Sequence, residues 1–169
     1  MQIRNGGNRV IDHNLTQEQH DWLNGWLELF GAWVYSGRLE KRMTSVIAQY
    51  MESVEPSRVM TRPMCNDDDG MLISQVVDSV ISIDNEALKI FLSYYAHGSS
   101  RYSIAVYMQK TAIPRNIPTR GMNRRGVPSL SYFRRLVDDK LNASLYLLYE
   151  PLRIAMNSRK RVEKIRKIA

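Results

Sequence analysis

The chain has 169 residues, a formal net charge of +7 and a single cysteine, Cys65. This length suits one domain that buries about two-thirds of the surface exposed by its unfolded chain. No run of about 18 apolar residues could cross a membrane, no apolar signal segment opens the chain, and one cysteine excludes a disulfide framework or a cysteine-rich zinc site. We therefore expect a soluble, cytoplasmic protein with no membrane partner, metal ion or other cofactor.

The positive charge is concentrated in the later part of the chain. Residues 1–60 carry 6 Lys and Arg against 7 Asp and Glu, residues 61–100 carry 2 against 6, and residues 101–169 carry 16 against 4. Such a basic block is the electrostatic footprint of a protein that contacts phosphates. It fits DNA binding and also ribosomal or general RNA binding, so charge by itself does not choose the partner.

A tryptophan-rich helix is predicted after a flexible arm over residues 1–14, which has turn residues and no apolar periodicity. Thr16 and Gln19 fit a capping box, in which two side chains satisfy free backbone amides at the start of a helix. We interpret the apolar stripe of this helix as core, with an aromatic partner-binding patch as the alternative. The stripe continues to Gly37 and consists of Trp22, Leu23, Trp26, Leu27, Phe30, Trp33 and Val34.

Two further helices are expected, one over residues 43–54 and one after the acidic run Asp67, Asp68 and Asp69. The three carboxylates raise the hypothesis of a metal-dependent nuclease or recombination enzyme. Adjacent side chains cannot all point into one site, however, and no second acidic or histidine cluster lies nearby in the sequence. Negative charge at a helix start is stabilised by the helix dipole. We therefore interpret the run as an N-cap and predict no catalytic residue.

A helix-turn-helix unit is predicted over about residues 85–148. Its first helix, residues 85–96, ends at Gly98, a residue type that readily turns left-handed. The second begins at the N-caps Ser99 and Ser100 and runs through Arg101 to about residue 109. The third opens at Pro128-Ser129, and its apolar side consists of Leu130, Phe133, Val137, Leu141 and Leu148.

The start of the third helix has the residues of a DNA-reading element. Ser, Tyr and Arg side chains on an exposed helix end can reach phosphates and base edges in a major groove. An amphipathic helix with a merely solvated face is the alternative. The candidate DNA-binding residues on this helix are Ser129, Ser131, Tyr132, Arg134 and Arg135.

A long insertion, residues 110–127, separates the second and third helices. It contains two prolines, two glycines and no acid, and it greatly exceeds the ordinary turn of about three to four residues. We predict a loop that contacts a phosphate backbone, with a flexible solvated loop as the alternative. Its candidate contacts are Arg115, Arg120, Arg124 and Arg125.

Pro151 is predicted to kink or end the third helix. We expect one helical domain over residues 15–150 and a basic tail over residues 151–169, which could bind DNA, nascent RNA or an acidic protein surface. The expected fold class is therefore all-α: a compact helical domain containing a helix-turn-helix with a long basic inserted loop, followed by a basic C-terminal tail.

Two passages resemble the phage antitermination protein Q family, in its zinc-free branch. The first is CNDDDGMLI at residues 65–73, with a cysteine, an acidic run, a glycine and an apolar helix opening. The second is LKIFLSYYAHGSSRYSIA at residues 88–105, an aromatic-rich helix that ends in Gly before a Ser-x-x-x-Ile-Ala helix. Gly31-Ala32-Trp33 is similar to part of the family's first helix. The resemblance covers about residues 20–150.

The resemblance implies a late-gene transcription antitermination factor with a helix-turn-helix like the fourth conserved region of sigma factors. Such a protein binds a DNA site near the phage late promoter and engages paused host RNA polymerase that still holds sigma. The polymerase then reads through terminators, with the protein at the RNA exit and nascent RNA as a further partner. By this resemblance Ser100 and Arg101 would also contact DNA. The alternative is a helix-turn-helix repressor or activator that acts only at its operator.

Overall fold

The computed structural model describes residues 14–37, 47, 50, 62–119 and 121–168. In these ranges the helices are α1 (Gln17–Tyr35), α3 (Asp67–Ile81), α4 (Asn85–Tyr95), α5 (Arg101–Thr111) and α6 (Leu130–Ile168). Strands β1 (Arg115–Thr119) and β2 (Met122–Gly126) form an antiparallel hairpin between α5 and α6. The all-α fold class is confirmed, and no described helix is long and apolar enough to span a bilayer.

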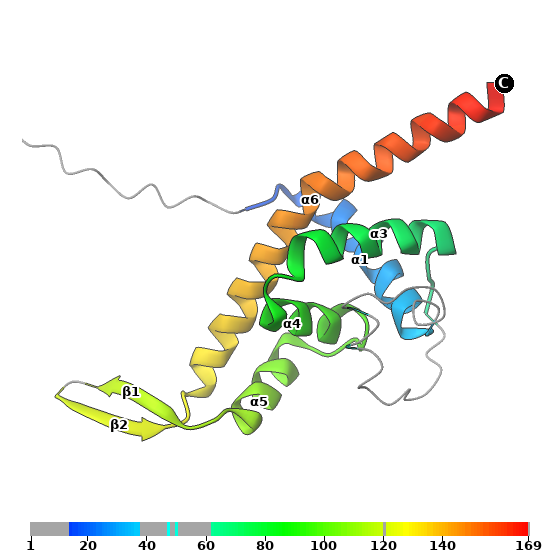
Figure 1. Ribbon diagram of the computed structural model, residues 1–169. Helices are drawn as coiled ribbons and strands as arrows, with labels where there is room; N and C mark the ends of the chain where they lie inside the picture. The colour runs from blue at the N-terminus through cyan, green and yellow to red at the C-terminus, as the bar shows by residue number, and fades with distance from the viewer. Residues whose placement is uncertain (1–13, 38–46, 48–49, 51–61, 120, 169) are drawn as a thin grey trace, which may run out of the picture.

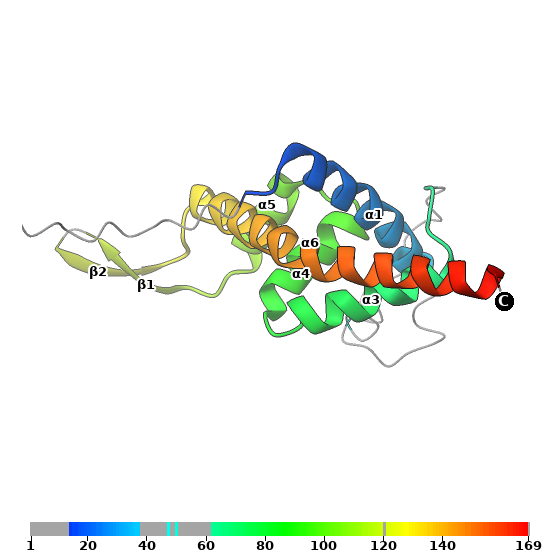
Figure 2. The same cartoon turned by 90° about the horizontal axis from the view of Figure 1, so that it is seen from above.

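Helix α6 runs from the hairpin to the C-terminal end of the molecule, and the other helices pack along it (Figure 1). Helices α1, α3 and α4 pack against its middle, and α5 and the hairpin lie at its first end (Figures 1 and 2). Its last turns, after Arg159, extend beyond the packed helices and are exposed from Lys160 onward. One end of α6 therefore carries the hairpin and the other end carries a basic segment.

The core is assembled from the apolar stripes that the sequence predicts. Trp33 is fully buried, and Trp22 and Trp26 pack partly buried against the core, which confirms the core interpretation of the tryptophan helix. The Trp22 ring also packs edge-on against Tyr149 of α6, with ring centroids 5.8 Å apart. The largest fully buried side chains are Trp33, Phe30, Phe91, Leu23, Leu27, Ile47, Ile73, Leu92, Leu141, Leu148 and Leu152.

Helices α1, α3 and α5 each begin directly after a polar side chain that caps the free backbone amides of the first turn. Thr16 and Gln19 form the expected capping box, with hydrogen bonds of 3.3 and 3.0 Å. Ser100 caps α5 by accepting from the Ser103 amide at 3.1 Å, and Gly98 adopts a φ of 68° after α4, both as predicted. For α3 the cap is Asn66, so the three aspartates occupy the first helical turn and supply charge at the dipole's positive end.

Two glycines permit close approaches to α1. A Cβ at Gly31 would overlap the Tyr95 carbonyl of α4, and a Cβ at Gly70 would overlap the Trp33 ring. Neither glycine has a positive φ, so the requirement is for space alone. Both belong to the sequence passages that resemble the Q family.

One predicted feature is met in part and another differs from the structure. Helix α6 bends about half way along, in agreement with the predicted kink, but it does not end at Pro151 and continues to Ile168. Packing of Leu148 and Leu152 into the core on both sides of the proline outweighs the lost backbone hydrogen bond. The predicted basic loop is a hairpin over residues 115–126. The helix expected over residues 43–54 and the arm over residues 1–14 fall largely outside the described residues.

Candidate nucleic-acid interface

The hairpin holds its arginines in a fixed register. Arg115 pairs with Gly126, Asn116 with Arg125 and Ile117 with Arg124, and the connection includes Gly121 at a φ of 87°. Side chains of directly paired residues share a face of an antiparallel ribbon. Arg115 and Arg124 therefore lie on one face and Arg125 on the other, beside Asn116. Sequence reasoning missed the exposed Asn116 amide, because only the hairpin register identifies its position.

The hairpin is attached to the first turn of α6. The Arg115 guanidinium carbon lies 4.9 Å from the centroid of the Tyr132 ring, a cation–π geometry. The Gln109 amide of α5 donates to the Pro128 carbonyl at 3.3 Å, which ties the chain just before α6 to α5. A cleft of about 580 Å³ lies between the hairpin and the helix start and is lined by both Arg115 and Tyr132.

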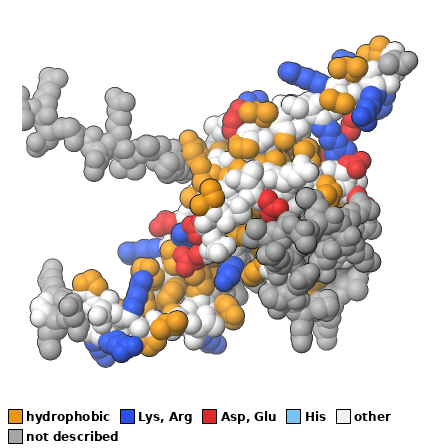
Figure 3. Space-filling model, viewed as in Figure 1, with side chains coloured by type: hydrophobic (Ala, Val, Ile, Leu, Met, Phe, Trp, Pro, Cys, Tyr) orange, Lys and Arg blue, Asp and Glu red, His pale blue; other side chains and the backbone are white. Residues whose placement is uncertain are grey.

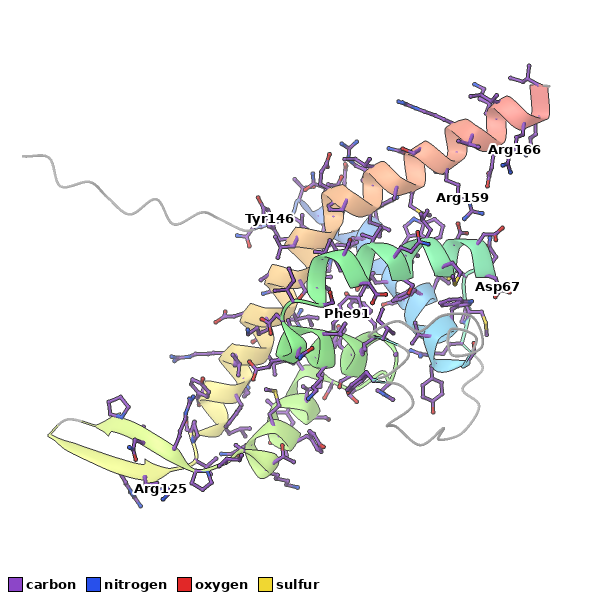
Figure 4. The ribbon with its side chains drawn as sticks, in the orientation of Figure 1. Asp67, Phe91, Arg125, Tyr146, Arg159 and Arg166 are labelled. Atoms are coloured by element: carbon purple, nitrogen blue, oxygen red, sulfur yellow. The ribbon has the colours of Figure 1, made fainter. Side chains whose placement is uncertain are left out.

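The first turns of α6 present polar side chains to solvent while Phe133 and Val137 anchor the helix in the core. The Ser129 hydroxyl accepts from the Tyr132 amide at 3.3 Å and so satisfies one free donor at the helix start. Figure 4 shows Arg125 on the hairpin beside this end of α6. We name the exposed set the hairpin–helix surface: Arg115, Arg124, Arg125, Ser129, Ser131, Tyr132, Arg134 and Arg135.

The hairpin–helix surface lies in a stretch without carboxylates. No Asp or Glu occurs between Arg101 and Val137 in the sequence. The next acid, Asp138, binds the Arg101 guanidinium at 2.9 Å and is thereby neutralised. Five arginines of the surface consequently have no described carboxylate partner and are available to phosphates. The structure thus gathers all the candidates on the insertion and the third helix, except Arg120, which lies outside the described residues.

Arg101 and Ser100 occupy a different position. The Arg101 guanidinium contacts Asp138 and, at 3.4 Å, Asn142 of α6, and it lies 5.8 Å from the Tyr94 ring. Ser100 is engaged in capping α5. In the structure Arg101, at the start of α5, contacts both α4 and α6, so it orients the helices that carry the surface. No local pattern predicts the Arg101–Asp138 pair, because its two residues lie 37 positions apart in the chain.

The acidic run of α3 has structural partners. Asp67 accepts from the Trp33 indole nitrogen at 2.9 Å, and Asp69 forms an ion pair with Arg159 of α6. Asp68 lies 3.7 Å from the same guanidinium. Within the described part of the chain, no three His, Cys, Asp or Glu side chains are gathered as metal ligands would be. Figure 4 shows Arg159 on α6 close to the end of α3 that carries Asp67.

Burial affects one reactive group beside this run. Cys65 is buried, and desolvation, followed by the charge of Asp69, raises the pKa of its thiol to about 11. The thiol therefore stays protonated at neutral pH, which argues for a packing role, as expected for a small buried side chain.

Comparisons with known proteins agree with the fold. The family model described as phage antitermination protein Q matches residues 20–123. The structure is similar to transcription antitermination factor Q21 in complex with Q21-binding-element DNA, with 68% identity, 88% of this chain and 99% of that chain covered, and a TM-score of 0.80. It is also similar to the bacteriophage 21 Q protein, with 63% identity, the same coverage of both chains and a TM-score of 0.77.

A comparison with curated proteins finds no match. The family match nevertheless covers more than half of the chain, and the structural matches cover almost the whole length of the relatives. The resemblance drawn from the acidic run and from residues 88–105 is confirmed. This protein belongs to the phage antitermination protein Q family.

Proposed function

We propose that this chain is a phage late-gene transcription antitermination factor that binds a specific DNA element through the hairpin–helix surface. The single observation that carries the proposal is the placement of five exposed arginines around the free start of α6, in a stretch without acids. The factor Q21, 68% identical, forms a complex with its own binding-element DNA. That relation supports DNA binding by this chain as well.

The surface divides into two kinds of contact. Arg115, Arg124 and Arg125 on the hairpin suit phosphates, which give affinity and orientation without reading sequence. Ser131, Tyr132, Arg134 and Arg135 on α6 suit base edges, because a helix of this width fits the major groove. Arg101 holds α6 in position by its ion pair with Asp138, so its contribution to DNA binding is indirect.

Loading onto host RNA polymerase would follow DNA docking. We propose that the DNA-bound protein engages the sigma-containing polymerase paused near the late promoter and stays with it at the RNA exit. Readthrough of terminators then results from interference with the RNA hairpin. The exposed basic end of α6 lies far from the DNA-binding end and could face nascent RNA. The alternative is a regulator that acts only at its operator and leaves termination unchanged.

DNA recognition is tested with a double variant, Arg134→Ala with Arg135→Ala. Each lost base contact should cost about 1–3 kcal/mol and should weaken binding to the cognate element more than binding to a scrambled duplex. The matched control is Arg166→Ala with Lys167→Ala, which removes the same charge from the other end of α6. Fluorescence anisotropy at several salt concentrations measures both. Unchanged preference for the cognate element in the first variant would refute the assignment.

A further inference from the structure

The hairpin has one face that contacts α6 and one face that is free. Arg115 and Arg124 lie on the first face, where the Arg115 guanidinium covers the Tyr132 ring. Asn116 and Arg125, which pair directly with each other, lie on the free face, and both are exposed. Figure 3 shows Lys and Arg side chains over the hairpin and the adjoining start of α6. The free face therefore combines one amide with one cation.

The presence of an amide at position 116 is not explained by the structure of the hairpin itself. Asn is depleted in strands and favoured in turns and caps, where its side chain bonds to nearby backbone. Asn116 instead lies inside a regularly paired strand, at the second of five pairs, away from the turn at Gly121. Its side chain forms no hydrogen bond to any described residue. The two donors and the acceptor of this amide are therefore available to a partner.

Asn116 lies close to the first turn of α6, which carries the proposed base contacts. It directly follows Arg115, whose guanidinium carbon is 4.9 Å from the centroid of the Tyr132 ring, and one strand residue advances the chain by about 3.3 Å. Asn116 also borders the cleft of about 580 Å³ together with Ser129 and Tyr132. A major groove is about 12 Å wide. The base of the hairpin and the first turn of α6 are therefore close enough to contact neighbouring base pairs of one groove.

We infer, resting on the proposed DNA binding, that Asn116 is a specificity-determining residue that reads an adenine in the major groove beside the bases contacted by α6. The amide nitrogen donates to adenine N7 and the amide oxygen accepts from the adenine N6 amino group, a donor and acceptor pattern that distinguishes adenine from the other bases. Arg125, on the same face, binds a backbone phosphate, which positions the hairpin and carries no sequence information. The hairpin thus extends the DNA element that α6 reads.

Selection from a pool of random duplexes measures the base preference of the full chain at each position. Asn116→Ala should reduce the preference for adenine about tenfold at one position, next to those affected by Arg134→Ala with Arg135→Ala. Arg125→Ala should instead weaken binding to all duplexes alike. Asn157→Ala, the matched control, removes the same amide from an exposed position far along α6 and should change nothing. An unchanged base preference in Asn116→Ala would overturn this inference alone, whereas a natural chain without any base preference would overturn the proposed function with it.

A change of one atom in the DNA separates a direct contact from an altered hairpin shape. Replacing the selected adenine by 7-deazaadenine removes the N7 acceptor and keeps the base pair. By fluorescence anisotropy, the natural chain should bind the modified duplex about fivefold more weakly than the unmodified one, because one hydrogen bond is lost. Asn116→Ala should bind the two duplexes equally. Equal binding of both duplexes by the natural chain, or the same loss in Asn116→Ala, would overturn the inference.

Discussion

Gly70→Ala is expected to destabilise the protein although alanine is the better helix former. The new Cβ would overlap three ring atoms of Trp33, whose side chain is fully buried and cannot move into solvent. Overpacking of this kind costs about 1–3 kcal/mol. Displacing the indole would also weaken its 2.9 Å hydrogen bond to Asp67, at about 0.5–1.5 kcal/mol. The helix-propensity gain of about 0.5–1 kcal/mol offsets only part of this loss.

The expected net loss for Gly70→Ala is therefore about 1–3 kcal/mol, or roughly 3–10 °C in Tm for a chain of this size. Urea unfolding followed by tryptophan fluorescence measures it, since all three tryptophans lie on α1. Gly25→Ala is the matched control, because nothing lies within 4 Å of its added Cβ and the helix gain of about 0.5–1 kcal/mol should appear alone. Equal or greater stability of Gly70→Ala than of the natural chain would refute the close-approach reasoning.

Three further outcomes are expected. The hydrogen bond from the Lys140 ammonium lowers the pKa of Asp84 in the folded protein. The ionised Asp84 therefore stabilises the fold above its unfolded pKa of 3.8, and this stabilisation is lost as the pH falls through the lower, folded pKa. Asp84→Asn, which keeps an N-cap, should therefore cost at most about 1 kcal/mol near neutral pH, and the difference in unfolding free energy should vanish in acid. Arg159→Ala removes the ion pair with Asp69, and amide hydrogen exchange should accelerate over residues 157–168 while residues 130–137 stay unchanged. Cys65 should resist alkylation near neutral pH until the protein unfolds, and rapid labelling of the folded chain would contradict its burial.

Much of the fold follows from local rules. Apolar periodicity located the described helices, and capping chemistry located the starts at Thr16 and Ser100, because each signal depends on residues within one or two turns. Gly98 ended α4 for the same reason. Local rules failed for the hairpin, where Pro118 and a run of basic residues obscure the alternation typical of a strand. The turn at Gly121 was the available signal.

Contacts between distant residues could not be read from the sequence. The Arg159–Asp69 pair joins positions 90 apart, and Arg101–Asp138 joins positions 37 apart. From the sequence alone, Arg159 is predicted to lie in a basic tail that could bind DNA, nascent RNA or an acidic protein surface, and Arg101 is predicted to lie at the DNA. The continuation of α6 past Pro151 has the same origin, because core packing by residues on both sides decides it. The candidate residues on the third helix and on the insertion were predicted, but the hairpin conformation that fixes the register of Arg115, Arg124 and Arg125 was not.

In vitro transcription with host RNA polymerase and sigma tests the central claim most directly. The template carries the late promoter with its flanking DNA element and an intrinsic terminator downstream, and the readout is the fraction of transcripts that pass the terminator. Readthrough that requires both the protein and the DNA element, and that is lost in Arg134→Ala with Arg135→Ala, is the expected result. Altered initiation with unchanged termination would contradict the account and would identify an operator-bound regulator.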